Sequence, residues 1–384
     1  MCVENSSKSS ITDNSDFFPK FDREQLRLGK LLGKGSFGTV YEVKEIQILQ
    51  KRRFSQAGTE SQFVADNCIR KGNHARYAVK FLSPEVVGDV GENGKFIRGI
   101  LDMDTEKRLL SDTEHPNIVK ARAFASVSPF DRKYFILMDR LYDTLHRRME
   151  RWAKKARLYS GRLAKIVDRK GKKKRELLEA RLVAAFDLSH ALGYLHDRKI
   201  IYRDLKPKNL GFDVRGDLKL FDFGLVGEMK DSRLADEGLY NLTGMTGCPR
   251  YMSPEVAKSE RYNEKCDVYS FAILLWEIMS LKTPFVAYKT IKEFEEHVWN
   301  GEHDRPLIHP SWPESIQTLL RTSWGKNINE RPNFTEIATL LKIQCVVVRG
   351  GSQMGLEHSS RRSTFIFERD VNKLLDSIHK TAHF

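Results

Sequence analysis

Four side chains in the middle of the sequence could together transfer a phosphoryl group. Asp204, Lys206 and Asn209 share one short stretch, and Asp222 follows after the next apolar stretch. Phosphoryl transfer from a metal-bound nucleotide needs a base beside the attacking hydroxyl, a cation on the transferred group and oxygen ligands for magnesium. Two carboxylates, one carboxamide and one ammonium group can supply all of these. Either aspartate alone could equally be an ordinary turn acid.

Apolar residues on both sides predict the elements that position these side chains. Ile200-Ile201 comes before the stretch, and the alternating residues 218–221 lead directly to Asp222. This pattern predicts a strand, a tight loop and a hairpin whose end brings Asp222 beside Asp204. The helical spacing of apolar residues over 179–196 predicts a long helix behind the loop.

The two motifs resemble the catalytic loop and the metal-binding DFG motif of the protein kinase family. They read Ile201-Tyr202-Arg203-Asp204-Leu205-Lys206-Pro207-Lys208-Asn209 and Asp222-Phe223-Gly224. The resemblance implies that Asp204 accepts the proton of the substrate hydroxyl and that Lys206 steadies the γ-phosphate of ATP. It also implies that Asn209 and Asp222 hold Mg²⁺. Tyr202 stands where the usual motif has histidine, and we expect it to be a packing side chain.

A glycine-rich stretch over residues 33–38 has the pattern G-x-G-x-x-G. This pattern also opens dinucleotide-binding folds, but a helix must follow it there, whereas Val40-Tyr41-Glu42-Val43 alternates like a strand. A strand–glycine loop–strand hairpin resembles the loop that kinases close over the phosphates of ATP. By this resemblance the nucleotide-binding residues are Leu32, Gly33, Lys34, Gly35, Ser36, Phe37, Gly38, Val40, Ala78, Lys80, Met138, Asp139 and Leu141.

Lys80 ends an apolar strand that resembles the third strand of the family. The resemblance implies that its ammonium group binds the α- and β-phosphates; the alternative is a solvated lysine at a strand end. Such a phosphate-binding lysine needs a carboxylate partner from the following helix. We expect Glu106 to be this partner, because Leu110 lies one turn further on and can pack beneath it. Glu114 and Asp104 are poorer candidates, since neither precedes an apolar core residue by one turn.

The apolar residues 134–138 predict a buried strand that runs into the hinge between the two lobes. By the resemblance Met138 is the gatekeeper, and the backbone around Asp139 and Leu141 forms hydrogen bonds with adenine. Asp143 could then reach the ribose, although the hinge is one residue shorter than is usual in the family.

Two residues depart from the family pattern at the site. Gly211 occupies the position of an apolar side chain beneath adenine, so either the pocket floor is widened or Leu210 or Phe212 fills it. Cys248 replaces the threonine that bridges the catalytic aspartate and lysine in serine/threonine kinases, and a thiol is a weaker hydrogen-bond donor. The Cys248 thiol would be reactive only if its thiolate were stabilised, for example by Lys206.

Residues 222–255 resemble the activation segment of the family. Arg203 precedes Asp204, and an arginine at this position can pair with a phosphate on that segment. Thr243 and Thr246 are the best acceptors for such a regulatory phosphate. The alternative is that both are unmodified loop residues.

The later part of the chain agrees with this resemblance. A continuous apolar run over 266–278 predicts a buried helix. Asp267, near its start, resembles the aspartate that holds the catalytic-loop backbone. Arg331 is expected to pair with Glu255 in the core, which is a structural role.

Most of the net charge of +14 lies in residues 147–181, which contain fifteen Lys or Arg and four acidic residues. This segment is an insertion or an extended pair of helices. Its role could be that of a solvated charged flap, of a nuclear-import or anionic-partner patch around 170–175, or of an RNA- or DNA-binding surface. Trp152 and Tyr159 are its few aromatic residues, which weakens the case for single-strand binding.

Cysteine usage and hydropathy suggest where the protein works. The five cysteines are scattered and form no CxxC pair, which favours a reducing compartment, the cytoplasm or the nucleus. Residues 1–16 lack the apolar core of a signal peptide. No apolar run is long enough to cross a bilayer, so we expect no membrane partner.

These features predict an α+β fold, namely the two-lobed kinase fold with a small antiparallel sheet and one helix over a mainly helical lobe. We expect a disordered segment over 1–22 and a kinase domain over 23–345. The N-lobe would comprise 23–141, and the C-lobe would comprise 142–345 with the basic insertion 147–181. A tail over 346–384 would follow, in which residues 371–378 form a short docked helix.

The predicted function is ATP- and Mg²⁺-dependent phosphorylation of Ser or Thr in protein substrates, within intracellular signalling. Asp204-Leu205-Lys206-Pro207 favours Ser/Thr specificity, whereas residues 267–271 lean toward the tyrosine-kinase-like branch. One alternative is a pseudokinase scaffold that binds partners through the same fold. Nucleic-acid binding through the basic segment would be a second role.

Overall fold

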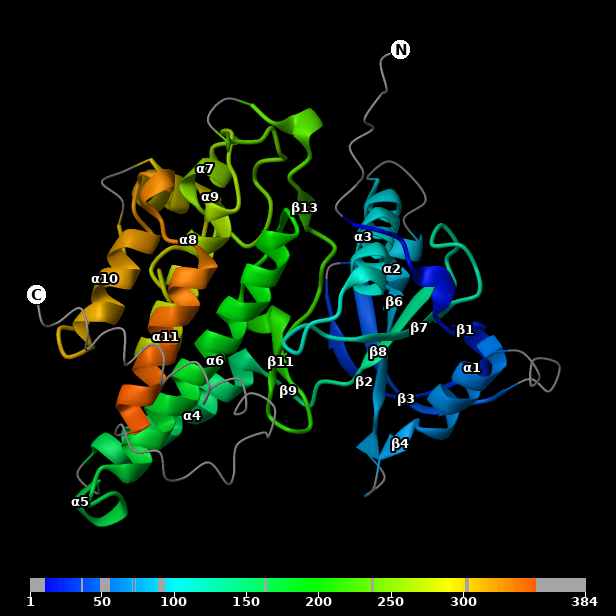
Figure 1. Cartoon of the computed structure of the whole chain (residues 1–384), viewed down its shortest axis with the longest axis horizontal. Coiled ribbons are helices and arrows are strands. Elements are labelled where there is room, and N and C mark those ends of the chain that lie inside the picture. Colours follow the sequence, from blue (N-terminus) through cyan, green and yellow to red (C-terminus); the bar gives the residue numbers. More distant parts are fainter. Residues whose placement is uncertain are drawn as a thin grey trace, which may run out of the picture.

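The computed structural model describes residues 11–35, 37–48, 56–70, 72, 74–88, 94–161, 164–235, 238–300 and 304–349. It has one part built on a sheet and one mainly helical part, which follow each other after strand β8 (Phe135–Asp139) (Figure 1). The predicted two-lobed α+β architecture is confirmed.

The small lobe is built on a six-stranded sheet with the order β1-β7-β8-β6-β3-β2. Neighbouring strands are antiparallel except β1, which runs parallel to β7. Helix α3 (Lys95–Asp112) packs on this sheet through buried residues that include Met103 and Leu109. The other strands are β1 (Lys20–Phe21), β2 (Leu26–Lys34), β3 (Gly38–Ile46), β6 (Tyr77–Leu82) and β7 (Ala121–Ala125).

The structure corrects the expected disorder of residues 1–22 for the part that it describes. Residues 11–22 are ordered, because Ile11 and Phe21 are buried and β1 pairs with β7. The carboxylate of Asp13 also lies 2.8 Å from the ammonium group of Lys107 on α3. Two buried apolar residues therefore anchor the stretch 11–22. Its average composition is polar and gave no indication of this.

The insertion between β3 and β6 is partly folded onto the small lobe. Its described elements are α1 (Gln56–Asp66), β4 (Ile69–Arg70) and β5 (His74–Ala75). Val64 and Cys68 are buried, and the Cys68 thiol lies 3.4 Å from the carbonyl oxygen of Val43 in β3. The insertion therefore extends the hydrophobic core of the small lobe.

Short strand pairs hold the predicted catalytic loop at the border of the two lobes. β10 (Ile200–Ile201) pairs with β13 (Gly227–Glu228). β11 (Leu210–Phe212) pairs with both β12 (Leu218–Leu220) and β9 (Asp143–Thr144). The loop lies between β10 and β11, and Asp222 follows β12, as the apolar pattern predicted.

The large lobe is mainly helical, with α8 (Lys265–Ser280) almost completely buried along its length. Its long helices α6 (Lys172–Asp197) and α11 (Phe334–Arg349) pack side by side (Figure 1). Among the helices of the described residues, none combines the length and hydrophobicity needed to cross a bilayer. The remaining helices are α2 (Pro84–Gly88) in the small lobe and α4 (Leu145–Ser160), α5 (Ala164–Val167), α6 (Lys172–Asp197), α7 (Pro254–Ala257), α9 (Ile291–Phe294), α10 (Glu314–Ser323) and α11 (Phe334–Arg349) in the large lobe.

The basic segment 147–181 forms most of α4, the short α5 and the start of α6. Trp152 and Leu177 anchor it in the core, while most of its described basic side chains are exposed. Asp168 accepts hydrogen bonds from the first backbone N–H groups of α6, 2.9 Å from Lys173 N and 2.8 Å from Lys174 N. The segment is therefore helical over most of its described length, and its role stays a prediction.

Helix α11 continues to Arg349, beyond the domain boundary expected at residue 345. The helix expected over 371–378 lies outside the described residues.

Candidate active site

The catalytic loop brings Asp204, Lys206 and Asn209 into direct contact. Oδ2 of Asp204 accepts hydrogen bonds from Lys206 Nζ at 2.6 Å and from Asn209 Nδ2 at 2.8 Å. The other carboxylate oxygen, Oδ1, is buried and has no hydrogen-bond partner among the described residues. An unpaired buried carboxylate oxygen is costly, and here it is available to a substrate hydroxyl.

Burial raises the pKa of Asp204 above its ordinary value, while Lys206 and the hydrogen bond from Asn209 act in the opposite direction. A raised pKa makes a carboxylate a stronger proton acceptor. The environment of Asp204 therefore favours the role of general base that the sequence predicted.

Asp267 of α8 holds the backbone of this loop. Its carboxylate accepts hydrogen bonds from Tyr202 N at 2.7 Å and Arg203 N at 2.8 Å, and lies 2.9 Å from His196 Nε2. Asp267 is fully buried, so these charge-assisted bonds are strong and fix the loop on the core of the large lobe.

Tyr202 packs as expected and also connects the two motifs. Its ring contacts the buried ring of Phe223 edge-on at 5.6 Å. Its hydroxyl donates a hydrogen bond to the carbonyl oxygen of Phe221 at 2.6 Å. The side chain at the usual histidine position thus ties the catalytic loop to the DFG motif.

Lys80 joins the small lobe to the DFG motif. Its ammonium group lies 2.7 Å from Asp222 Oδ1 and also forms an ion pair with Glu106 of α3. Glu106 is 1% exposed, so this contact places α3 against the site. The choice of Glu106 over Glu114 and Asp104 agrees with this geometry.

The three charges shift one another's pKa values. Burial alone would lower the pKa of Lys80, but the charges of Asp222 and Glu106 raise it above its ordinary value. The Lys80 charge lowers the pKa of Asp222, and burial raises that of Glu106. Lys80 is therefore a permanent cation in the site.

Asn209 and Asp222 have the donor atoms that a magnesium site needs. Asn209 uses Nδ2 to hold Asp204, which leaves its carbonyl oxygen for a metal. Lys80 contacts Oδ1 of Asp222, whose side chain is 43% exposed. Mg²⁺ prefers such oxygen ligands together with phosphate oxygens. Asp222 also has a positive φ of 66°, a backbone strain often found at functional sites.

The glycine-rich stretch forms the predicted strand–loop–strand hairpin. Gly33 pairs with Val40, and the backbone N–H of Gly35 donates to the carbonyl oxygen of Gly38 at 2.8 Å. Ser36 lies outside the described residues. The apolar residues predicted to face the nucleotide are partly buried: Leu32, Phe37 and Val40.

Gly38 allows the hairpin to lie directly on the catalytic lysine. A Cβ atom at this position would be 3.0 Å from Cε of Lys80, closer than most real contacts. Lys34, in contrast, forms an exposed ion pair with Glu85 at 2.5 Å. The structure therefore places the Lys34 side chain on the surface of the lobe.

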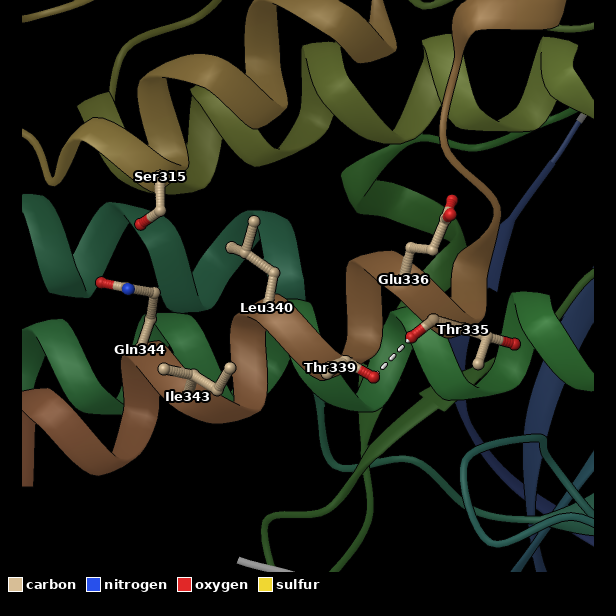
Figure 2. Close-up of a pocket in the computed structure, with 7 residues that line it drawn as sticks. All are labelled: Ser315, Thr335, Glu336, Thr339, Leu340, Ile343 and Gln344. Carbon is tan, nitrogen blue, oxygen red and sulfur yellow. Dashed lines mark hydrogen bonds between the residues drawn. The ribbon is translucent and has the colours of Figure 1, made fainter. Parts of the chain in front are cut away.

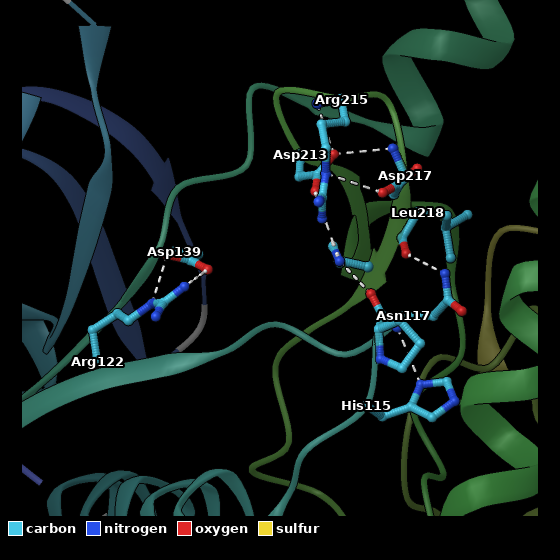
Figure 3. Close-up of polar contacts among 10 residues, drawn as sticks. His115, Asn117, Arg122, Asp139, Asp213, Arg215, Asp217 and Leu218 are labelled. Atoms are coloured by element: carbon cyan, nitrogen blue, oxygen red, sulfur yellow. Dashed lines mark hydrogen bonds and ion pairs between the residues drawn. The ribbon is translucent and has the colours of Figure 1, made fainter. Parts of the chain in front are cut away.

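The hinge follows β8 as predicted. Ala78 pairs with Met138, and both are buried. Arg122 holds the carboxylate of Asp139 through two hydrogen bonds of 2.8 and 2.7 Å (Figure 3). The backbone N–H of Leu141 donates to no group within the described part of the chain, which leaves it available to adenine.

Asn117 holds the start of strand β12. Its Nδ2 donates to the carbonyl oxygen of Leu218 at 3.0 Å, and its N–H lies 3.1 Å from Nδ1 of His115 (Figure 3). The same view shows Asp213 at the turn between β11 and β12, in contact with Arg215. Both contacts support the β11–β12 hairpin at its turn, the end opposite to Asp222.

Leu141 fills the space above Gly211. A Cβ atom on Gly211 would lie 2.6 Å from Cδ1 of Leu141, so no larger residue fits without movement. We expected either a wider pocket floor or a floor filled by Leu210 or Phe212. In the structure it is Leu141 of the hinge that lies against Gly211.

Asp143 is engaged by helix α4. Its Oδ2 lies 3.0 Å from Arg148 Nε and also contacts Arg151, and its Oδ1 accepts the N–H of Thr144 at 3.0 Å. Although burial opposes the shift, these two arginines lower the pKa of Asp143. In this structure the carboxylate faces α4, and its contact with the ribose stays a prediction.

Arg203 organises the activation segment. Its guanidinium donates to the carbonyl oxygens of Leu225 at 2.7 Å and Val226 at 3.1 Å. It also donates to the hydroxyl groups of Thr243 at 2.8 Å and Tyr262 at 3.1 Å. Of the two threonines suggested as phosphate acceptors, Thr243 is therefore the one in contact with Arg203.

Cys248 is partly buried beside the catalytic loop. Burial raises the pKa of its thiol, and the opposing effect of the Lys206 charge is smaller. The condition for a reactive thiolate, stabilisation by Lys206, is therefore not met.

Asp102 lies beside the DFG motif, although its sequence context did not mark it as a site residue. It lies on α3 one turn before Glu106, and its Cβ would be 2.8 Å from a Cβ atom on Gly224. Burial raises the pKa of Asp102 to about 7; Lys80 opposes this shift, and Asp222 adds to it. Its spacing from Glu106 on one helix face is the signal that could have identified it.

Comparison with known proteins agrees with this geometry. The model of the protein kinase domain matches residues 57–340. The dual specificity protein kinase pyk3 of Dictyostelium discoideum is 30% identical over 70% of this chain and 17% of its own length. A probable LIM domain-containing serine/threonine-protein kinase of the same organism is 30% identical over 86% of this chain and 41% of its own length.

A third relative is mitogen-activated protein kinase kinase kinase 7 of Drosophila melanogaster, 28% identical over 72% of this chain and 36% of its own length. The chain thus spans less than half the length of each of these relatives. The family match covers β6 with Lys80, the catalytic loop with Asp204 and the DFG motif with Asp222. The chain therefore belongs to the eukaryotic-type protein kinase family.

Proposed function

We propose that this protein is an ATP- and Mg²⁺-dependent kinase that phosphorylates serine and threonine side chains of other proteins. The observation that supports this most is the contact of Lys80 with both Glu106 and Asp222. Kinases need this ion pair and the DFG aspartate in place together. A scaffold without activity would not require either contact.

The proposed mechanism uses side chains in their observed places. Asp204 accepts the proton of the substrate hydroxyl at Oδ1, because Lys206 and Asn209 already occupy Oδ2. Lys206, 2.6 Å from Asp204, is placed to contact the phosphoryl group during transfer. When bound through Asn209 and Asp222, Mg²⁺ supplies positive charge to the phosphate oxygens.

The preference for Ser and Thr rests on the motif Asp204-Leu205-Lys206-Pro207. The relatives include both dual specificity kinases and serine/threonine kinases by name. The preference for Ser and Thr is therefore proposed from the motif and not from these relatives. We propose that the substrates are proteins of the cytoplasm or nucleus.

A peptide series that differs only in the acceptor residue tests the specificity. We expect phosphate on the Ser and Thr peptides and none on the Tyr peptide, measured by mass spectrometry. Equal phosphorylation of the Tyr peptide would instead make the protein a dual specificity kinase.

Replacement of a metal-binding residue tests the activity itself. Asp222→Ala should lower the rate of phosphate transfer by on the order of a hundredfold or more, because the metal and Lys80 both lose a partner. The exposed Asp231→Ala, in the same segment, is the control and should keep the wild-type rate. A wild-type protein that binds ATP but forms no phosphopeptide would be a scaffold.

A further inference from the structure

A groove lies on the large lobe, on a surface formed by α10 and α11. It has a volume of about 540 Å³ and is lined by Ser315 of α10 and by residues of α11 that include Leu340, Ile343 and Gln344. Figure 2 shows Ser315 across from Leu340 and Gln344. None of the residues that line the groove belongs to the active site described above. The groove therefore needs an explanation that is separate from catalysis.

Helix α11 has apolar residues on two faces. Ile337 and Leu341 are buried on the face that packs against α6. On another face Leu340 and Ile343 are only partly buried, and Val347 is 62% exposed. A surface helix normally has a polar outer face, so this second strip, at helical spacing, indicates an additional apolar partner.

We propose that residues 367–378 of the same chain bind this groove as an amphipathic helix. Their apolar residues recur with the spacing of one helix face. Charged residues, among them Arg369, Lys373 and Asp376, occupy the positions between them. The apolar residues are Phe367, Val371, Leu374, Leu375 and Ile378.

The connection permits this contact. Helix α11 ends at Arg349, whose guanidinium pairs with Glu179 of α6 and holds this end of the helix on the lobe. Residues 350–366 can span about 50 Å when extended. The strip over 336–347 and a helix over 367–378 are each about 18 Å long. A short tether also gives an effective concentration in the millimolar range, so weak contacts suffice.

The charges at the end of the groove favour an antiparallel orientation of residues 367–378 on α11. A segment that turns back after Arg349 runs antiparallel to α11. This direction brings His379 and Lys380 to the end of the groove that carries Glu336, which is exposed. An opposite charge at that end favours this orientation over the reverse one.

Hydrogen exchange of the full chain tests the proposal. Backbone amides of residues 367–378 should exchange about tenfold more slowly in the wild type than in Leu340→Asp, because an acid in the groove excludes an apolar helix face. Leu307→Asp is the matched control: Leu307 is 88% exposed and lies outside the groove, so this variant should exchange like the wild type.

A change on the other side of the contact provides the second measurement. Leu374→Asp should accelerate exchange of the same amides and leave the melting temperature of the kinase domain unchanged. Fast exchange in the wild type would overturn the proposal, as would slow exchange that Leu340→Asp leaves intact. Protection that appears only at high protein concentration would indicate a second copy as the occupant, and would also overturn it.

Discussion

At the scale of single residues, the site differs from the family pattern at Gly211, and a neighbouring residue, Leu141, compensates for the missing side chain. Gly211 leaves out the apolar side chain below adenine, and Leu141 of the hinge occupies that space. Sequence comparison at either position alone would suggest a gap in the pocket. In the structure Leu141 lies where a side chain on Gly211 would be.

The first prediction concerns this floor. Gly211→Leu should raise the KM for ATP about tenfold or more, because its Cβ would lie 2.6 Å from Cδ1 of Leu141 and overpacking disturbs the site. The double variant Gly211→Leu/Leu141→Ala should recover part of the loss, since it frees the space. Steady-state kinetics at varied ATP measures both. A KM that Gly211→Leu leaves unchanged would contradict the described contact.

At the scale of elements, α6 supports the catalytic hairpin through a buried acid. Asp187 is 7% exposed, and its carboxylate accepts the backbone N–H of Leu218 at the start of β12. Burial raises the pKa of Asp187 to about 7, with a smaller contribution from Asp217. The folded state therefore keeps a proton that the unfolded state releases at lower pH.

The second prediction follows from this proton. The contribution of Asp187 to the stability of the wild type should fall as pH rises from about 4 to 7, because at this carboxyl group the folded state binds more protons than the unfolded state in that range. Asp187→Asn removes this dependence and keeps an acceptor oxygen for Leu218. At pH 8 it should be more stable than the wild type by about 2–4 kcal/mol.

Urea unfolding at pH 4.5 and pH 8 measures the difference, and the two proteins should differ little at the lower pH. Asp231→Asn, at an exposed position, is the control and should follow the wild type at both values. Equal stability of Asp187→Asn and the wild type at pH 8 would show that the carboxyl group of Asp187 is not buried as described.

At the scale of the whole molecule, one ion pair joins the end of the activation segment to the core of the large lobe. Arg331 and Glu255 are both buried, with N–O distances of 2.6 and 3.1 Å. Arg331 also donates to the carbonyl oxygens of Gly325 and Lys265, each at 3.1 Å. This pair was expected from the sequence, and its role is structural.

The third prediction is that Arg331→Met destabilises the protein by about 3–5 kcal/mol, because it leaves the Glu255 carboxylate buried without a partner. The double variant Glu255→Met/Arg331→Met should lose less than the sum of the two single variants. Denaturant unfolding of all four proteins gives the coupling. Strictly additive losses would mean that the two charges do not stabilise each other.

The sequence by itself determined the chemistry of this protein. Asp204, Asn209 and Asp222 lie in short local motifs, and the alternating apolar residues around them sufficed to predict that they meet. Glu106 could also be chosen, since the rule of one helical turn is local. The boundaries were less predictable: two buried apolar residues order the stretch over 11–22 against its polar average composition.

The tertiary structure decided which side chains remain available to the nucleotide. Asp143 faces Arg148 on α4, and Leu141 lies against Gly211. Each of these contacts depends on rotamers and on the distance between elements that fold separately, and no local pattern encodes either. Motifs in the sequence therefore specify the reacting groups, whereas packing between elements sets the shape and charge of the pocket around them.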